Sequence, residues 1–177
     1  MYANDLNPSS VKHLDENIKI NSIADPKSRI STSCSCARKF LLRLVQEEHV
    51  PISRVVMNFP SGAPEFLDVF KGLYSKWKGE SQPKMPIVHC YCFIKGELEI
   101  DSARERVRSA LFDDPDHGAT ILKDEDIDVR IVRDVAPKKV KVCATFRVPE
   151  AVAYDICNEP EQKKLKIGEK QGNCSTS

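Results

Sequence analysis

Strand-like and helix-like stretches alternate along most of this chain, and that alternation constrains the fold more than any other feature. Strands are expected where short apolar runs end at polar turns, over Tyr2–Asp5, Arg29–Ser33, Arg54–Asn58 and Ile87–Ile94. Helices are expected where apolar residues recur at helical spacing, over Ser9–Asn21, Ala37–Glu48, Ala63–Lys78 and Asp101–Leu111. The pattern predicts an α/β fold in which helices cover both faces of a mostly parallel sheet.

The last part of the chain departs from this alternation. The acidic stretch Asp113–Asp126 is expected to form a long loop, and Val129–Val135 and Lys141–Val148 are expected to pair as an antiparallel hairpin. From Asn158 onward the residues are mostly polar, with few apolar anchors. We therefore expect one domain over residues 1–157 and a disordered polar tail over residues 158–177.

Length and charge set broad limits on what the chain can be. The chain has 177 residues, enough for one domain with a sizeable core, and a net charge of +1. This balance neither requires nor excludes a nucleic-acid partner. The longest apolar stretches, such as Ile87–Ile94, are too short to span a bilayer, and Met1 leads into a polar motif rather than a secretion signal. We expect an intracellular monomer.

The cysteines indicate a reduced state rather than a metal site. There are seven, an odd number, which favours free thiols inside the cell. Cys34 and Cys36, and likewise Cys90 and Cys92, are separated by one residue, whereas zinc sites usually have two residues between the first ligands. Alternate residues of a strand share a face, so we interpret these pairs as core packing and expect no metal.

Asp5 is the first candidate functional residue. It ends the first expected strand and stands directly before a helix-start signal, Asn7-Pro8 followed by Ser9 or Ser10 as a cap. The strand Tyr2–Asp5 reads as the second strand of a dinucleotide-type α/β sheet. In such sheets an acid after the second strand binds ribose hydroxyls, and ligands lie at the carboxyl ends of the strands. Leu6 would then pack beside the adenine. The alternative is that Asp5 only caps the following helix.

Asn58 is the second candidate, at the end of the strand Arg54–Asn58. The segment Asn58-Phe59-Pro60 resembles the Asn-Pro-Pro-aromatic motif of enzymes that methylate base nitrogens. In that motif the amide and nearby carbonyl groups hold the target base. The alternative is an asparagine that satisfies backbone groups in a strand-to-helix turn.

Two further segments carry weaker signals. Cys36-Ala37 follows the strand expected over Arg29–Ser33, which would be the third strand of a complete sheet of this type. At the end of that strand such enzymes usually place an acid for the adenine amino group. Lys138, Lys139 and Lys141 form a basic cluster at the expected hairpin, able to meet phosphates or to lie as a solvated turn.

Together these stretches resemble the tRNA (guanine-N1)-methyltransferases that modify guanosine 37, most of all the eukaryotic branch. The similarity runs from Tyr2 to about Pro149. It rests on Ala3-Asn4-Asp5-Leu6-Asn7-Pro8 with Asn17–Asn21, Met57-Asn58-Phe59-Pro60 with Ala63–Leu67, Val88–Phe93, Arg133–Lys139 and Phe146–Pro149. An antiparallel pair closing the sheet is also the pattern of the Rossmann-like class I methyltransferases.

The resemblance implies S-adenosylmethionine as cofactor, the anticodon stem-loop of tRNA as substrate, and methyl transfer to guanine N1. It implies that Asp5, Leu6 and Asn58 contact the cofactor and that Asn58 and Pro60 border the target base. Cys36 and Ala37 stand where the family has Asp and a small residue, so the adenine contact differs here. Localisation would be the cytoplasm, the nucleus and the mitochondrial matrix.

The resemblance also implies that parts of the site have no counterpart in this chain. The family's first strand, its glycine-rich loop and its catalytic arginine and glutamate all correspond to sequence before Tyr2. We therefore expect a C-terminal fragment with reduced or no activity. Because the first strand is central in this fold, we expect either an unstable chain or direct pairing of the strand ending at Asp5 with Arg54–Asn58.

Two other functions stay open at this point. One is a non-catalytic tRNA-binding fragment that uses the cluster Lys138–Lys141 and the lysine-rich tail. The other is transfer of the aminocarboxypropyl group of the same cofactor to a tRNA base, which the Asn58-Phe59-Pro60 turn and the strand His89–Phe93 disfavour.

Overall fold

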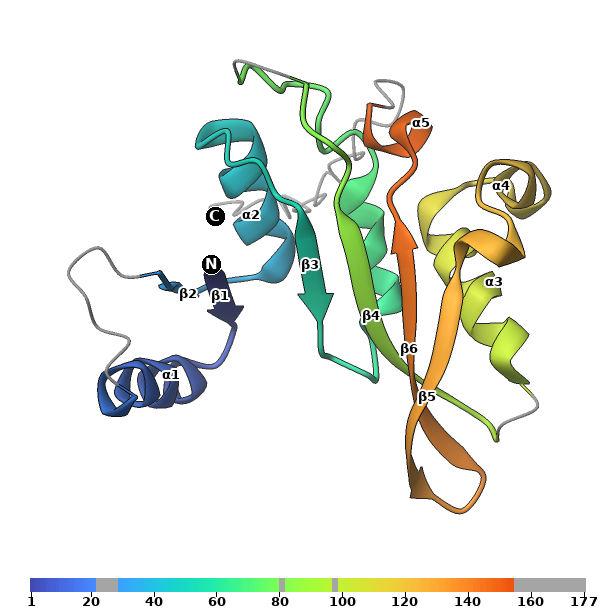
Figure 1. Cartoon of the computed structure of the whole chain (residues 1–177), viewed down its shortest axis with the longest axis horizontal. Coiled ribbons are helices and arrows are strands. Elements are labelled where there is room, and N and C mark those ends of the chain that lie inside the picture. Colours follow the sequence, from blue (N-terminus) through green and yellow to red (C-terminus); the bar gives the residue numbers. More distant parts are fainter. Residues whose placement is uncertain (22–28, 80–81, 97–98, 155–177) are drawn as a thin grey trace, which may run out of the picture.

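The strands of this protein lie in two separate sheets. The structure, a computed structural model, describes residues 1–21, 29–79, 82–96 and 99–154. One sheet pairs β1 (Tyr2–Asp5) with β2 (Ser31–Cys34) in parallel. The other has the order β3 (Arg54–Met57), β4 (Ile87–Ile94), β6 (Lys139–Arg147) and β5 (Asp128–Ala136) (Figure 1). The predicted α/β class is confirmed.

The second sheet combines parallel and antiparallel pairing. β3 runs parallel to β4, with Arg54 opposite Ile87, whereas β4 and β6 are antiparallel along their whole length. β5 and β6 form the expected antiparallel hairpin, whose turn places Lys138 at a positive φ of 59°. Figure 1 shows this hairpin extending beyond the rest of the sheet.

Seven helical segments accompany the strands in the described residues. They are α1 (Pro8–Ile20), α2 (Ala37–Leu42) continued by the π-helix η1 (Arg43–Glu47), the 3-10 segments η2 (Pro64–Phe70) and η4 (Asp124–Asp126), α3 (Ile100–Leu111), α4 (Pro115–Ile121) and α5 (Glu150–Ala153). Three of the predicted helix spans are close to the observed ones: α1, α2 continued by η1, and α3.

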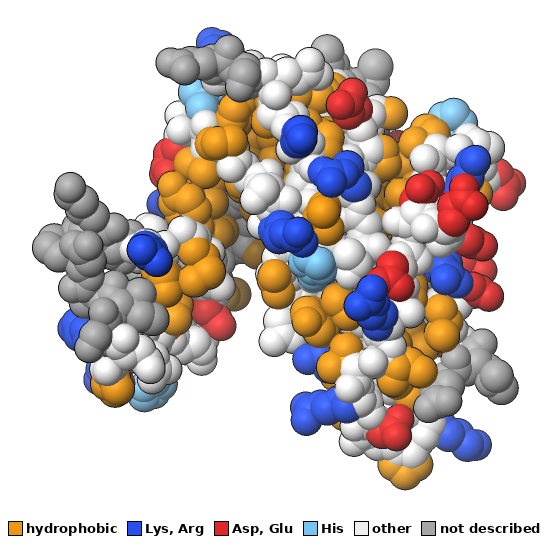
Figure 2. Space-filling model, in the orientation of Figure 1, with side chains coloured by type: hydrophobic (Ala, Val, Ile, Leu, Met, Phe, Trp, Pro, Cys, Tyr) orange, Lys and Arg blue, Asp and Glu red, His pale blue; other side chains and the backbone are white. Residues whose placement is uncertain are grey.

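The core lies on one face of the four-stranded sheet. Along β4 the buried residues alternate with half-buried ones, and Val88 and Cys90 pack with Val107 and Leu111 of α3. The other face carries the half-buried side chains of β4 and faces the viewer in Figure 2, where lysine, arginine and histidine side chains lie among apolar ones. In the described chain, helices therefore cover one face of this sheet, and the expectation of helices on both faces is wrong.

The two sheets are not joined by strand pairing. β1 pairs only with β2, and β3 pairs only with β4, so each has one edge without a strand partner in the described residues. Val56 of β3 is 66 % exposed and Tyr2 of β1 is 43 % exposed. The expected direct pairing of these two strands is absent from the structure, whereas the expected loss of a ladder partner at both strands is observed.

The segment Ala63–Lys78 was expected to form one long helix, and that expectation is wrong. Only η2 is regular, and it is followed by turns. Gly72 has a positive φ of 64°, and the N–H groups of Gly72 and Tyr74 donate to the carbonyls of Val152 and Ala153, at 2.9 Å each. Tertiary hydrogen bonds to α5 thus replace the helical ones.

The stretch Asp113–Asp126 is not the long loop that was expected, because it contains α4 and η4. Asp114 caps α4 by accepting hydrogen bonds from the N–H groups of Asp116 and His117, and Pro115 occupies the first turn. An aspartate followed by proline is a standard helix-start signal, so the sequence carried this information.

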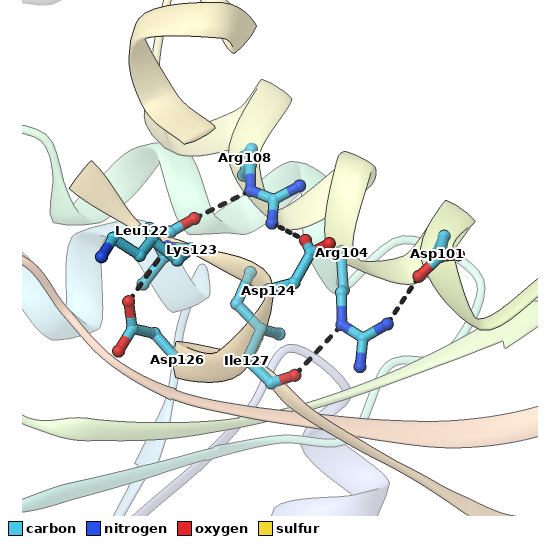
Figure 3. Close-up of polar contacts among 8 residues, drawn as sticks. All are labelled: Asp101, Arg104, Arg108, Leu122, Lys123, Asp124, Asp126 and Ile127. Carbon is cyan, nitrogen blue, oxygen red and sulfur yellow. Dashed lines mark hydrogen bonds and ion pairs between the residues drawn. The ribbon is translucent and has the colours of Figure 1, made fainter. Parts of the chain in front are cut away.

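Two arginines of α3 hold this segment against the helix (Figure 3). Arg108 donates to the carbonyl of Leu122 at 2.9 Å and pairs with the Asp124 carboxylate. Arg104 donates to the carbonyl of Ile127 at 3.3 Å and to Asp101 at 2.5 Å. Guanidinium groups with several fixed donors are suited to such bridging.

Two further expectations from the sequence concern the C-terminal tail and membrane-spanning helices. The predicted tail, residues 158–177, lies outside the described residues. Among the residues that are described, none of the helices has the length and apolar character needed to cross a membrane.

Candidate functional site

The predicted site residues all follow the carboxyl ends of parallel strands. Asp5 is the last residue of β1, Cys36 is the second residue after β2, and Asn58 directly follows β3. β1 and β2 are parallel, and the arrows of β1 and β3 point the same way in Figure 1. This is the edge at which open α/β sheets bind their ligands.

Asp5 is exposed and partly engaged in its own turn. One carboxylate oxygen accepts a hydrogen bond from the N–H of Asn7 at 2.8 Å. The cap of α1 is Asn7, which accepts from the N–H of Ser9 at 3.0 Å, so both the expected serine cap and the alternative role for Asp5 are wrong. The second oxygen of Asp5 has no protein hydrogen-bond partner in the described residues and faces solvent. Leu6 beside it is 72 % exposed.

Asn4 fastens the ends of β1 and β2 to each other. Its side-chain amide donates to the carbonyl of Ser35 at 2.8 Å, and its oxygen accepts from the Ser35 N–H at 3.1 Å and from the Ser35 hydroxyl at 2.9 Å. These bonds fix the position of Asp5 relative to Cys36 and Ala37. Cys36 is the N-cap of α2 and Ala37 is its first residue, and both are half-buried.

Asn58 is exposed, and its side-chain oxygen accepts a hydrogen bond from the ammonium group of Lys141 at 3.0 Å. Within the described residues, the amide N–H groups of Asn58 have no side-chain acceptor and remain available as donors. The following turn is tight, because the carbonyl of Phe59 accepts from the N–H groups of Gly62 and Ala63 at 2.9 and 2.7 Å. A Cβ at Gly62 would come within 2.5 Å of the Phe59 ring, so this position favours glycine.

Pro60 is anchored to the neighbouring strand. Its carbonyl accepts a hydrogen bond from the N–H of Phe93 in β4 at 3.2 Å. The ring of Phe59 is 55 % exposed and makes an edge contact with Phe66, with 6.1 Å between ring centroids. The turn after β3 is thus held in place by β4 and η2.

Lys139 and Lys141 lie on the strand rather than in a solvated turn. The ammonium group of Lys141 is 4.8 Å from the centroid of the Tyr91 ring, and that of Lys139 is 4.3 Å from the Phe93 ring. Both distances are within the range of cation–π attraction. Sequence reasoning missed the contact between Lys141 and Asn58, because two residues so far apart in the chain meet only through the pairing of β4 with β6.

The two halves of the site lie in different sheets. In the described part of the chain no hydrogen bond or ion pair joins Asp5 with Asn58, and the unpaired edges of β1 and β3 belong to these two sheets. The structure therefore positions each half separately.

The thiols of Cys90 and Cys92 lie apart from this arrangement. Cys90 and Cys92 point into the core, and burial raises the pKa of Cys90 to about 12 and also raises that of Cys92. Such thiols stay protonated and are poor metal ligands. Among the described residues there is no group of three or more histidine, cysteine or acidic residues placed to hold a metal.

Comparison with curated proteins finds relatives named tRNA (guanine(37)-N(1))-methyltransferase. The chain is 37 % identical over 172 residues to the tRNA (guanine(37)-N(1))-methyltransferase of Phytophthora infestans, covering 94 % of this chain and 38 % of that protein. It is 38 % identical over 154 residues to the protein of the same name from Dictyostelium discoideum, covering 87 % and 32 %. This chain is a relative of a segment of the tRNA (guanine(37)-N(1))-methyltransferases. The resemblance inferred from the sequence is confirmed.

The match is to part of these proteins only. The chain spans 38 % of the length of the Phytophthora infestans methyltransferase and 24 % of that of a Vitis vinifera relative. No family model matches the chain.

Solved structures confirm the fold. Trm5b from Pyrococcus abyssi aligns with a TM-score of 0.52 and 22 % identity, covering 84 % of this chain and 37 % of that one. TYW2 from M. jannaschii, solved in complex with AdoMet, aligns with a TM-score of 0.51 and 18 % identity, covering 83 % and 57 %. At this level of identity the two structures support the architecture and do not distinguish one chemistry from another.

Proposed function

We propose that this chain forms part of an enzyme that transfers a methyl group from S-adenosylmethionine to N1 of guanosine 37 in tRNA. The observation that carries the proposal is the placement of Asp5 and Asn58 after parallel strands, within a segment similar to methyltransferases of that name. By the same resemblance, the substrate contact is the anticodon stem-loop, and the enzyme acts as a monomer in the cytoplasm, nucleus and mitochondrial matrix.

The residues at the end of β1 fit the nucleoside part of the cofactor. The free carboxylate oxygen of Asp5 is a suitable acceptor for ribose hydroxyls, and the exposed side chain of Leu6 offers an apolar surface for adenine. Cys36 and Ala37 would contact the adenine through backbone groups, since neither side chain is an acid. The cofactor would supply an electrophilic methyl group.

Asn58 would orient the target base. With its oxygen held by Lys141, its amide N–H groups can donate to an acceptor on the guanine, and the rigid Phe59-Pro60 turn keeps the amide in place. Methylation at N1 also requires loss of the N1 proton, and the described residues at this edge offer no positioned base. The chain alone is therefore expected to show little or no turnover.

A chimera tests this proposal. The 172 matched residues of the Phytophthora infestans methyltransferase are replaced by the corresponding residues of this chain, and methyl transfer is measured on transcripts with guanosine or adenosine at position 37. We expect transfer only to the guanosine transcript. A folded chimera, verified by its thermal unfolding, that transfers no methyl group would contradict the proposal.

Variants of the chimera separate binding from folding. Asp5→Ala should raise the KM for the cofactor, and Asn58→Ala should lower kcat/KM for tRNA by about ten- to a hundredfold, since a lost hydrogen bond to a fixed partner costs roughly 1–3 kcal/mol. Asp15→Ala, on α1, is the matched control for Asp5 and should leave both parameters unchanged. Equal losses in the variants and the control would indicate a folding defect.

The second candidate is a non-catalytic tRNA-binding role, supported by the lysines that lie against Tyr91 and Phe93. Replacing Lys138, Lys139 and Lys141 by methionine should then abolish tRNA retention by the 177-residue chain, while Asp5→Ala leaves it intact. Retention that survives the lysine replacements would exclude this role.

A further inference from the structure

Lys141 reaches Asn58 by crossing the strand that lies between them. Lys141 is on β6, and β4 separates β6 from β3 (Figure 1). Asn58 directly follows β3, whose last residue pairs with Cys90, so Asn58 lies level with Tyr91 of β4. The ammonium group of Lys141 is 4.8 Å from the centroid of the Tyr91 ring and 3.0 Å from the side-chain oxygen of Asn58. The ring thus supports the lysine side chain where it bridges to the turn after β3.

This contact sets the orientation of the Asn58 amide. An ammonium group has three hydrogen-bond donors and no acceptor, so the bond from Lys141 must end on the amide oxygen. The two N–H groups of Asn58 are then directed away from the lysine. Lys141 therefore selects the amide orientation in which the outward group is a donor.

The groups that hold Lys141 leave its positive charge in place, because an amide and an aromatic ring are both uncharged. By strand register, the titratable side chains nearest to Lys141 on this face are Arg54 on β3, His89 and Tyr91 on β4, Arg133 on β5, and Lys139 and Cys143 on β6. Those that carry a full charge at neutral pH are cations. A hydrogen bond from a charged donor polarises the amide that accepts it, so the N–H groups of Asn58 become stronger donors to an anion.

A positive potential behind this amide matters when the target guanine becomes an anion. N1 of guanine carries a proton at neutral pH, and its methylation requires that proton to pass to a base of the buffer or of the enzyme. The lone pair left on N1 forms the bond to the methyl carbon, while the electron pair of the carbon–sulfur bond stays on sulfur. Loss of the proton spreads negative charge over N1 and the adjacent O6. Donors and a cation near O6 stabilise this anion more than the neutral base.

We propose that Lys141 is a positioning residue that acts through Asn58: it directs the amide N–H groups to O6 of the target guanine and favours the form of the base without its N1 proton. This inference rests on the proposed function and adds the group that makes N1 nucleophilic. An opposite charge within about 4–6 Å of an acid lowers its pKa by about 1–3. Because one amide separates Lys141 from the base, we expect the lower end of this range, which is about a tenfold gain in deprotonated guanine at neutral pH.

Two substitutions of Lys141 separate its charge from its hydrogen bond. Lys141→Gln keeps an N–H donor and removes the charge, whereas Lys141→Arg keeps both. Single-turnover methylation of the guanosine-37 transcript is measured from pH 6 to 9.5 in the chimera with the Phytophthora infestans methyltransferase. We expect Lys141→Gln to move the midpoint of the pH–rate profile up by about one pH unit and to slow transfer about tenfold at pH 7. Lys141→Arg should keep the midpoint of the parent chimera.

Binding and a distant lysine provide the controls. The Kd for tRNA should be the same in Lys141→Gln and the parent, because the guanine binds with its N1 proton. Lys76→Gln, in the exposed turns after η2, should leave both the profile and the Kd unchanged. Thermal unfolding of each variant verifies that it is folded.

The other outcomes of this experiment would overturn the inference. A rate lowered by the same factor at every pH would mean that Lys141 only holds the turn, and a raised Kd with an unmoved midpoint would mean that it binds an RNA phosphate. An active parent chimera with either result contradicts only this inference. A parent chimera that transfers no methyl group contradicts the proposed function, and the inference fails with it.

Discussion

Among single residues, Asp124 gives the clearest pH dependence. The hydrogen bond from Arg108 lowers the pKa of Asp124 below its ordinary value of 3.8. A carboxylate whose pKa is lower in the folded protein stabilises the fold above its unfolded pKa, and this contribution is lost as the pH falls through the folded pKa. We therefore expect Asp124→Asn to lower the denaturation midpoint at pH 7 and to have a smaller effect at pH 3. Equal shifts at both values would show that the charge does not contribute.

Arg108 itself supports more than the ion pair. Its side chain is 11 % exposed and donates to the carbonyl of the buried residue Leu122. We expect Arg108→Met to lower the free energy of unfolding by about 1–3 kcal/mol, because a buried carbonyl is left without its donor. Arg130→Met is the control: Arg130 pairs with Asp128, and both are well exposed, so its loss should cost no more than about 1 kcal/mol in urea denaturation.

The sequence pointed to those candidate site residues that depend on local context. Asp5 and Asn58 were recognised because each follows a strand and precedes a turn, and both facts can be read within a few residues. Lys141 and Asn4 were not given their observed contacts, because these join residues that are 83 and 31 positions apart. Their contacts follow from strand pairing, which a single sequence does not specify.

Among the structural elements, regular strands were predicted better than helices. The strand β4 was predicted with its observed bounds because its residues are β-branched, aromatic or cysteine throughout. The helix predicted over Ala63–Lys78 failed although its apolar spacing is helical, since the N–H groups of Gly72 and Tyr74 bond to α5 instead. Periodicity reports which face is buried, and it does not report which carbonyl accepts each N–H.

The contact between α5 and the turns after η2 gives a prediction about truncation. Val152 and Ala153 are buried, at 4 % and 0 % exposed. Their carbonyls accept hydrogen bonds from the N–H groups of Gly72 and Tyr74. A chain ending at Pro149 should lose at least about 1.5–3 kcal/mol of stability from the burial of Val152 alone. A chain ending at Cys157, the expected domain boundary, should unfold at the same urea concentration as the full chain. A loss of stability in that control would place the boundary further along.

At the level of the whole molecule, the sequence predicted the class of fold and the missing ladder partner, but not the resulting arrangement. In doubly wound sheets another strand lies between the two that end at Asp5 and Asn58, so the resemblance implied an open edge at each of them. Whether β1 and β3 would pair directly depended on competing energies: a direct pair gains backbone hydrogen bonds but must shift the helices packed beside each strand. The structure keeps the two sheets apart.

This separation should also limit cofactor binding by the isolated chain. Asp5 and Asn58 lie in different sheets, so no strand pairing fixes the spacing that a bound S-adenosylmethionine requires. We expect no binding at micromolar concentrations in isothermal titration of the 177-residue chain. Micromolar affinity of the chain alone would show that the two halves of the site are already held in register.

Hydrogen exchange of the isolated chain examines the strand edges directly. β4 and β6 have a strand on each side, whereas β1 and β3 have one partner each. Amides on a free edge exchange without global unfolding, so those of Tyr2–Asp5 and Arg54–Met57 should exchange at least about tenfold faster than those of β4. The outer strand β5 is an internal comparison, because it too has one partner, β6. Full protection of Arg54–Met57 in a monomer would contradict this prediction and would mean that the edge of β3 is already covered.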